Sequence, residues 1–361
     1  VAALVKRQVD LGITIPGDGE YGKSMSSNVD YGAWWSYSFN RLGGLELTDG
    51  GPFADEPKRS TPGHVRLTTF PDRRDWTIFA DAYHDPESGI AVGERGALFP
   101  TATGPVTYTG HDAIAADIAN FTAALAESDQ KTGFITSLSP GSASRIGNDY
   151  YSTEEEFIWA CADAMREEYK AIIDAGFILQ ADCPDLAMSY ALYPGISVAD
   201  YRKIIAMNVE ALNQAVKDLP ADRMRMHVCW GSTLGPHHGD IPIKDIVDIV
   251  LKAKPMAVSF PGANPRHGHE WKVWKDVKLP DGKAIIPGVI DSTSNFVEHP
   301  ELVADRIVQY AGAVGRENVI AGVDCGFGTF AGRVQVDTKI VWMKLASLAE
   351  GARLASKQLW N

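Results

Sequence analysis

The sequence has no run of eighteen apolar residues, so it predicts no membrane-spanning helix. It has no excess of positive charge either, because its formal net charge is −12 at pH 7. This balance argues against a surface that binds nucleic acid. Cysteines are also few, and their irregular spacing does not suggest a disulfide framework. Four reduced thiols in a cytoplasmic enzyme fit better: Cys161, Cys183, Cys229 and Cys325.

Short apolar runs alternate with helical segments along most of the chain, which is typical of βα units and a parallel sheet. The runs are rich in Val, Ile and Leu with little alternation, as in strands that are buried on both faces. They cover residues 12–18, 133–139, 176–182, 225–231, 255–260, 284–291 and 318–325. Seven strands are one short of a (β/α)8 TIM barrel. We expect residues 1–361 to form a single barrel domain whose first strand precedes Val1, since the opening residues read as the second half of an amphipathic helix.

Two features of the segments between these strands can be checked. Residues 21–132 are rich in Gly, Pro, Asp and aromatic residues, and we expect them to form an excursion over the catalytic face. A helix is expected at 153–175, with Ser152 and Glu155 as its capping box and Gly176 as its C-terminal stop.

The motif HVCWG ends one predicted strand and places His227 and Cys229 two residues apart, so both side chains point to the same side. A second cysteine, Cys325, ends another predicted strand within GVDCGFG. The carboxyl ends of barrel strands form the face where active sites lie. Two thiolates and one imidazole favour zinc. Taken alone, the pattern also fits two core thiols and a satisfied histidine.

The sequence around these residues resembles the catalytic barrel of the cobalamin-independent methionine synthase family. It is most similar to the single-barrel branch, which includes epoxyalkane–coenzyme M transferase-like proteins. The motifs that carry the resemblance occur in the family's order along nearly the whole chain. They are GDGE (17–20), LQADCPD (179–185), HVCWG (227–231), PGVIDSTSNFVEHPELVADRI (287–307), DCG (324–326) and WMKLASLAEGARLAS (342–356).

The resemblance implies a catalytic Zn²⁺ held by His227, Cys229 and Cys325, which activates a substrate thiol as thiolate. It also implies that Glu20 and Asp182 grip the ammonium group of homocysteine. Without the family, Glu20 reads as a solvated turn carboxylate and Asp182 as a helix cap. Trp230, beside Cys229, is a further candidate for substrate binding.

The chain departs from the family pattern at two places. Pro261 stands where the family has a glutamate that binds zinc, and the candidates to replace it are Cys183, His267 and His269. Thr293 stands where methionine synthases have a histidine, the proposed acid, although Asp291 next to it remains. His299 is a candidate catalytic replacement for that histidine, but its Glu-His-Pro context reads equally well as a helix start.

The sequence therefore predicts a zinc-dependent transferase that moves a methyl or alkyl group to a thiol. Its partners would be a small thiol acceptor and an alkyl donor, with methyl-folate among the candidate donors. The alternative is a zinc-dependent lyase or hydrolase that uses a metal-bound water on the same site. A non-catalytic barrel with structural zinc is a third reading, but only three ligands are evident and structural zinc normally has four. The oligomeric state is left open.

Overall fold

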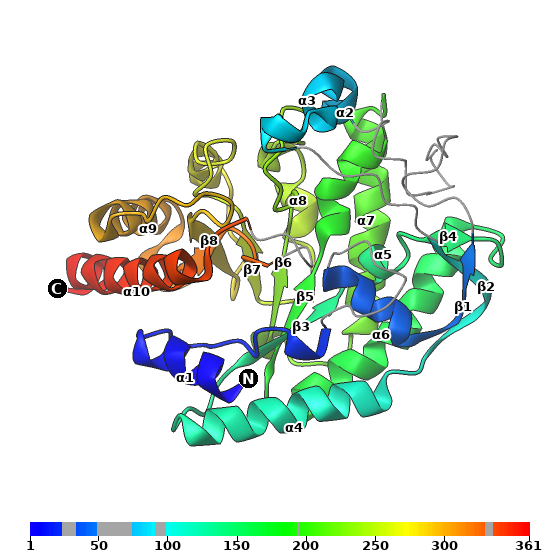
Figure 1. The fold of residues 1–361 in the computed structure, drawn as a ribbon, viewed down its shortest axis with the longest axis horizontal. Coiled ribbons are helices and arrows are strands. Elements are labelled where there is room, and N and C mark those ends of the chain that lie inside the picture. Colours follow the sequence, from blue (N-terminus) through cyan, green and yellow to red (C-terminus); the bar gives the residue numbers. More distant parts are fainter. Residues whose placement is uncertain (24–33, 49–73, 91–98, 194, 329–334) are drawn as a thin grey trace.

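The computed structural model describes residues 1–23, 34–48, 74–90, 99–193, 195–328 and 335–361 (Figure 1). A curved parallel sheet of six strands forms its centre, in the order β3-β5-β6-β7-β8-β9. The strands are β3 (Phe134–Leu138), β5 (Ile178–Asp182), β6 (Met224–His227), β7 (Ala257–Phe260), β8 (Ala284–Ile290) and β9 (Gly322–Val323). Gly17 adds a parallel bridge to Phe134 at the β3 edge. All seven predicted strands thus have a counterpart, most of them shorter than expected.

The long helices cover the outer face of the sheet, as in a barrel built from βα units (Figure 1). Their apolar faces pack inward, and the fully buried side chains of Phe121, Phe157, Met165 and Tyr169 lie in the central core. The helices are α1 (Ala2–Asp10), α4 (His111–Glu127), α5 (Pro140–Ala143), α6 (Glu154–Asp174), α7 (Val198–Ala215), α8 (Val247–Val250), α9 (Pro300–Val314) and α10 (Thr338–Trp360). Among the described residues, no helix is both long enough and apolar enough to cross a membrane.

Helix α6 begins one residue later than its predicted cap. Thr153 is the N-cap, because its side chain accepts a hydrogen bond from the Glu156 N–H at 3.1 Å. Glu156 in turn accepts from the backbone N–H of Ser152 at 3.1 Å. The predicted pair of Ser152 and Glu155 is therefore wrong by one position, although a capping interaction of the expected type is present. The C-terminal stop is confirmed, since Gly176 follows the helix with a φ of +87°.

Regular elements occur within the range 21–132. An antiparallel pair, β1 (Leu42–Thr48) and β2 (Phe99–Tyr108), joins β4 (Gly147–Asn148) in a second small sheet. Two short helices follow β1, α2 (Arg74–Ile78) and α3 (Ala80–His84). The carboxylate of Asp75 accepts hydrogen bonds from the backbone N–H groups of His238 and Gly239, at 2.9 and 2.8 Å. This segment therefore contacts the loop that follows β6.

Buried ion pairs and a hydrogen bond connect the second sheet to the barrel helices. Arg41, just before β1, forms ion pairs with Asp117 of α4 at 2.7 Å and with Glu168 of α6 at 3.1 Å. Tyr108 at the end of β2 donates a hydrogen bond to Glu168 at 2.6 Å. All four side chains are buried. Removing one partner would leave an unpaired charge in the interior, which typically costs about 3–5 kcal/mol.

The sheet does not close on itself within the described residues, because its order ends at β3 on one side and β9 on the other. We call the space between residues 13–17 and β9 the seam. The guanidinium of Arg7 on α1 lies 4.3 Å from the ring centroid of Trp342 on α10, so the two helices meet outside it. Apolar side chains line this space: Leu4, Ile13, Ile15, Ala321, Val323, Val341, Trp342, Leu345 and Leu348.

Candidate metal centre and substrate cleft

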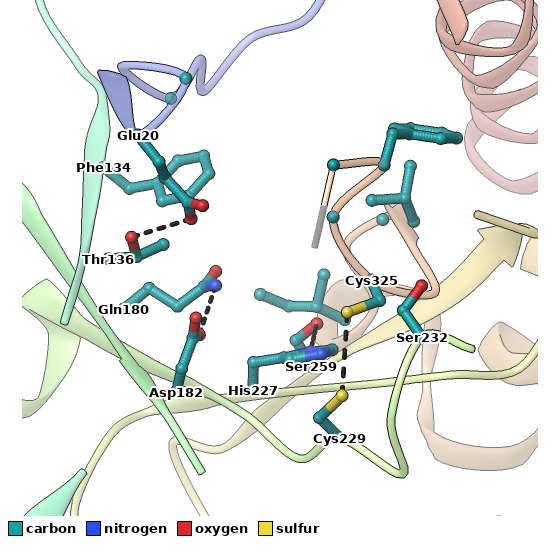
Figure 2. A pocket seen from close by; sticks show the side chains of 18 of the residues that line it. Glu20, Phe134, Thr136, Gln180, Asp182, His227, Cys229, Ser232, Ser259 and Cys325 are labelled. Carbon is teal, nitrogen blue, oxygen red and sulfur yellow. Dashed lines mark hydrogen bonds between the residues drawn. The ribbon is translucent and has the colours of Figure 1, made fainter. Parts of the chain in front are cut away.

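One cleft of about 560 Å³ includes the apolar residues of the seam in its lining and reaches the carboxyl ends of β5 and β6. It brings together five of the predicted site residues, which come from segments far apart in the sequence (Figure 2). Figure 2 shows them on two facing sides. We call one side the metal wall, formed by His227, Cys229, Cys325 and Ser259. The other side is the acidic wall, formed by Glu20, Asp182, Gln180 and Thr136.

The spacing of the metal wall fits a zinc ion. One ligand atom from each of His227, Cys229 and Cys325 lies within 4.8 Å of the other two. The two sulfur atoms are 3.7 Å apart. Zinc–sulfur bonds of about 2.3 Å in a tetrahedron place two sulfurs roughly 3.8 Å apart. The arrangement therefore has the size that this metal requires.

The orientation of His227 also fits a metal ligand. Its Nδ1 lies 3.1 Å from the hydroxyl oxygen of Ser259, whereas its buried Nε2 has no hydrogen-bond partner among the described residues. A buried ring nitrogen without a partner is costly unless something else binds it. Ser259 thus holds the ring while Nε2 remains available, which is the usual arrangement of a metal-binding histidine.

The cysteines favour a bound cation for electrostatic reasons. The hydrogen bond to Cys229 and burial raise the pKa of Cys325 well above its usual range. The backbone N–H of Gly231 donates to the sulfur of Cys229 at 3.2 Å. Without a positive charge between them, two sulfurs 3.7 Å apart and partly shielded from water cannot both be thiolates. A dication would compensate both charges, so the donor set suits zinc.

On the acidic wall, burial shifts the pKa of both carboxylates, and each carboxylate accepts a side-chain hydrogen bond. Burial raises the pKa of Glu20 to about 7, and nearby Lys23 opposes this shift. Thr136 donates to Glu20 at 2.9 Å, and the amide of Gln180 donates to Asp182 at 2.7 Å. Burial also raises the pKa of Asp182, whereas His227 opposes the shift. Two carboxylates whose charged forms burial disfavours are suited to a ligand that brings positive charge.

Arg225 lines the same cleft and was not predicted from the sequence. Burial lowers its pKa to about 10, while Asp182 counteracts this shift, so the guanidinium is charged at neutral pH. Ser259 was not predicted from the sequence either, although the pairing of β6 with β7 indicates it. It lies in register with His227 on the neighbouring strand, and residues opposite each other on adjacent parallel strands are close neighbours.

Among the described residues, no fourth protein ligand joins this cluster. Pro261 follows β7 and carries no side chain that can bind a metal. Cys183 is fully buried, and its thiol donates to the carbonyl of Ala181 at 3.5 Å. It does not belong to the cluster of possible ligands found in the described part of the chain. Three protein ligands and an open position are typical of catalytic zinc.

His267, in the loop after β7, has other partners. Its Nδ1 lies 2.8 Å from Glu270 and its Nε2 3.1 Å from Asp240. Burial alone would lower the pKa of His267, but the hydrogen bonds to Asp240 and Glu270 raise it to about 9. The imidazolium is therefore an ionic link between two loops, and its ring packs 4.8 Å from that of Trp230.

Three other predicted residues lie outside the cleft lining. His299 is the N-cap of α9, and its side chain is 74% exposed. This position agrees with the interpretation of Glu-His-Pro as the start of a helix. Asp291 is buried and accepts hydrogen bonds from the backbone N–H groups of Thr293 and Ser294, which shapes the turn after β8. Trp230 is also buried, and its indole N–H donates to the carbonyl of Ile241 at 2.7 Å. These contacts give all three residues structural roles.

No family model matches the chain. The chain is 27% identical over 218 residues to the methionine synthase of Saccharolobus solfataricus, covering 59% of this chain and 54% of that protein. It is 24% identical over 215 residues to the methionine synthase of Thermococcus kodakarensis, with the same coverage of both. The chain therefore spans about half the length of the curated relatives it matches.

The fold matches a solved structure over nearly the whole chain. This is the B12-independent methionine synthase of Shewanella sp. W3-18-1 in complex with selenomethionine, with a TM-score of 0.67 and 17% identity. The match covers 99% of this chain and 86% of that one. It shows the fold to be a TIM barrel, as the sequence predicts. Together, the comparisons confirm the resemblance drawn from the motifs.

Proposed function

We propose that this relative of the cobalamin-independent methionine synthases is a zinc-dependent transferase that moves a methyl or alkyl group to a thiol. The acceptor is a thiol that also carries an ammonium group, as homocysteine does. The observation that carries the proposal is the pairing of two unlike walls across one cleft. His227, Cys229 and Cys325 converge on one side, and the carboxylates of Glu20 and Asp182 face them.

Nε2 of His227 and the sulfurs of Cys229 and Cys325 would hold the metal. Zinc bound there would supply a positive charge that favours the thiolate form of the acceptor over the thiol. This matters because a free thiol has a pKa of about 8.5, so only a few per cent is ionised at neutral pH. A zinc held by three protein ligands would keep a position open for an external sulfur.

The protein residues bind and orient the acceptor. Glu20 and Asp182 receive the ammonium group, which neutralises carboxylates that burial has made unfavourable. In the transfer, the thiol gives up its proton and its sulfur forms a bond to the alkyl carbon. The bond between this carbon and the donor breaks, and its electron pair leaves with the donor, which takes up a proton. Holding sulfur and carbon in line is the main contribution of such a cleft.

The test is cobalt substitution followed by absorption spectroscopy with added thiols. We expect one metal per chain, a new thiolate-to-cobalt band with homocysteine, and formation of methionine when a methyl donor such as methyl-folate is supplied. Cys229→Ser should lose the metal, whereas Cys183→Ser is the matched control and should keep it. Bound metal that shows no response to any thiol would contradict the transferase and favour the lyase or hydrolase alternative.

A further inference from the structure

Arg225 lies in the barrel interior, at a place that the chemistry above does not use. It stands on β6 two residues before His227, so both side chains point to the same side of the sheet. Its guanidinium carbon is 3.6 Å from the ring centroid of Phe134. Stacking on an aromatic ring restricts the guanidinium to one plane and stabilises its charge. The cation is therefore held in a defined orientation at the wall of the cleft.

The orientation of Arg225 decides which way the amide of Gln180 points. Nε of Arg225 donates a hydrogen bond to the amide oxygen of Gln180 at 2.7 Å. An arginine carries donors only, so the oxygen of the amide must face it and the NH2 group must face away. That NH2 group donates to Oδ1 of Asp182 at 2.7 Å (Figure 2). If the amide turned over, its oxygen would meet a carboxylate oxygen and repel it.

The last member of this chain of hydrogen bonds is the carboxylate that faces the acceptor. Gln180 occupies one oxygen of Asp182, and the described residues supply no hydrogen bond to the other, Oδ2. The charge of Asp182 also raises the pKa of Arg225 against the effect of burial, so the two charges act on each other. The guanidinium, the amide and the carboxylate thus form a directed series that ends on an oxygen with free acceptor capacity.

We propose that Arg225 is a positioning residue, which acts through Gln180 to hold the Asp182 carboxylate in the orientation that receives the ammonium group of the acceptor. This inference rests on the proposed function, because it assumes an acceptor that is both a thiol and an amine. It assigns part of the choice between amino-thiols and other thiols to Arg225, which acts through Gln180 and Asp182.

The experiment compares two thiols on the cobalt-substituted holoenzyme by titrating the thiolate-to-cobalt band. Homocysteine carries the ammonium group, and 4-mercaptobutanoate is the same thiol acid without it. Arg225→Met should weaken homocysteine binding about tenfold and leave 4-mercaptobutanoate binding unchanged. Arg225→Lys, which keeps a donor and a charge, should retain most of the preference for homocysteine.

A second variant removes the middle residue of the same hydrogen-bonded series. It keeps the proposal testable if Arg225→Met does not fold. Gln180→Leu should reduce the preference to the same extent, and the double variant should show no further loss, since both changes remove one interaction. Equal weakening of both thiols, or additive losses, would overturn the positioning role. If the wild-type protein gives no band with either thiol, the proposed function itself fails, which is a distinguishable result.

Discussion

The two walls of the cleft are built in different ways. The metal wall depends on two short motifs at the ends of β6 and β9, and its three ligand atoms need little besides Ser259 to face one another. The acidic wall depends on a wider set of polar contacts, in which Thr136 and Gln180 hold the two carboxylates. The metal ligands can thus be recognised from short motifs, although the barrel brings them together, whereas the carboxylates of the acidic wall depend on contacts with several neighbours.

This difference has a physical consequence. Soft ligands bind zinc with enough free energy to select their own geometry, so a few residues suffice. Buried carboxylates are unfavourable by themselves and acquire their state from neighbours, as the pKa of Glu20 near 7 illustrates. Damage to the metal wall should therefore abolish function, whereas damage to the acidic wall should change specificity and pH dependence.

The largest effect is expected for Cys325→Ser. A hard hydroxyl replaces a soft thiolate, so we expect loss of stoichiometric metal and a fall in transferase activity on the order of 1,000-fold or more. Metal analysis together with the rate of thiol methylation provides the measurement. Cys161→Ser, a buried cysteine of α6 outside the cluster, is the control and should keep its metal. Full activity in Cys325→Ser would show that the metal wall is not the reaction centre.

Next in size is Glu20→Gln on the acidic wall. In the proposed function it removes the charge that would pair with the ammonium group, and charge-assisted hydrogen bonds contribute about 2 kcal/mol, or roughly 30-fold in affinity. We expect a rise in KM for homocysteine with unchanged metal content. The comparison with 4-mercaptobutanoate separates this effect from general damage, because that thiol should bind the variant and the wild type alike.

The pH dependence of kcat/KM for homocysteine should also depend on the acidic wall. Glu20 has a pKa of about 7 and binds an ammonium group only when ionised. As the pH falls through 7, the carboxylate becomes protonated, and kcat/KM for homocysteine should fall by up to about tenfold per pH unit. Glu20→Gln should lack this step. A wild-type profile that is flat between pH 6 and 8 would contradict the assignment of Glu20 to the acceptor.

Ser259→Ala tests the support of the metal wall. Losing the partner of His227 Nδ1 should reduce metal affinity about tenfold, since groups that orient a ligand typically contribute 10–100-fold. Competition with a chelator measures this affinity directly. Ser292→Ala is a suitable control, because Ser292 is also buried but pairs with Ser232, and with no metal ligand among the described residues.

The smallest effect is expected for His299→Ala. The side chain caps α9 and is 74% exposed, so activity should change less than about twofold. A large loss of turnover at unchanged stability would return His299 to the role of proton donor that the sequence suggested.

The sequence predicted well what depends on short patterns. Buried strands read as apolar runs, and the strand-end positions of His227 and Cys229 follow from the period of two residues. The predicted N-cap of α6 was wrong by one residue because Ser152 and Thr153 are both favourable N-cap residues. Only the backbone angles decide between them.

What the sequence could not predict depends on contacts between distant segments. Ser259 is one of many serines until β7 is placed in register beside β6. Arg225 reads as an ordinary charged residue until its partners Gln180 and Phe134 are known. Trp230 adjoins a candidate ligand in sequence, yet its indole packs away from the cleft against His267. Proximity along the chain is a weak guide to a site that a barrel assembles from several strands.

The seam between residues 13–17 and β9 has a consequence for the behaviour of the protein at high concentration. Apolar side chains such as Ile15 and Val323 lie beside strand edges that the sheet leaves open in the described residues. Such an edge is a template for the backbone of another polypeptide. Self-association through strand pairing would therefore begin here, where the repulsion from a net charge of −12 is opposed by a local apolar surface. Colloidal stability is thus expected to depend on how accessible this edge is to other chains.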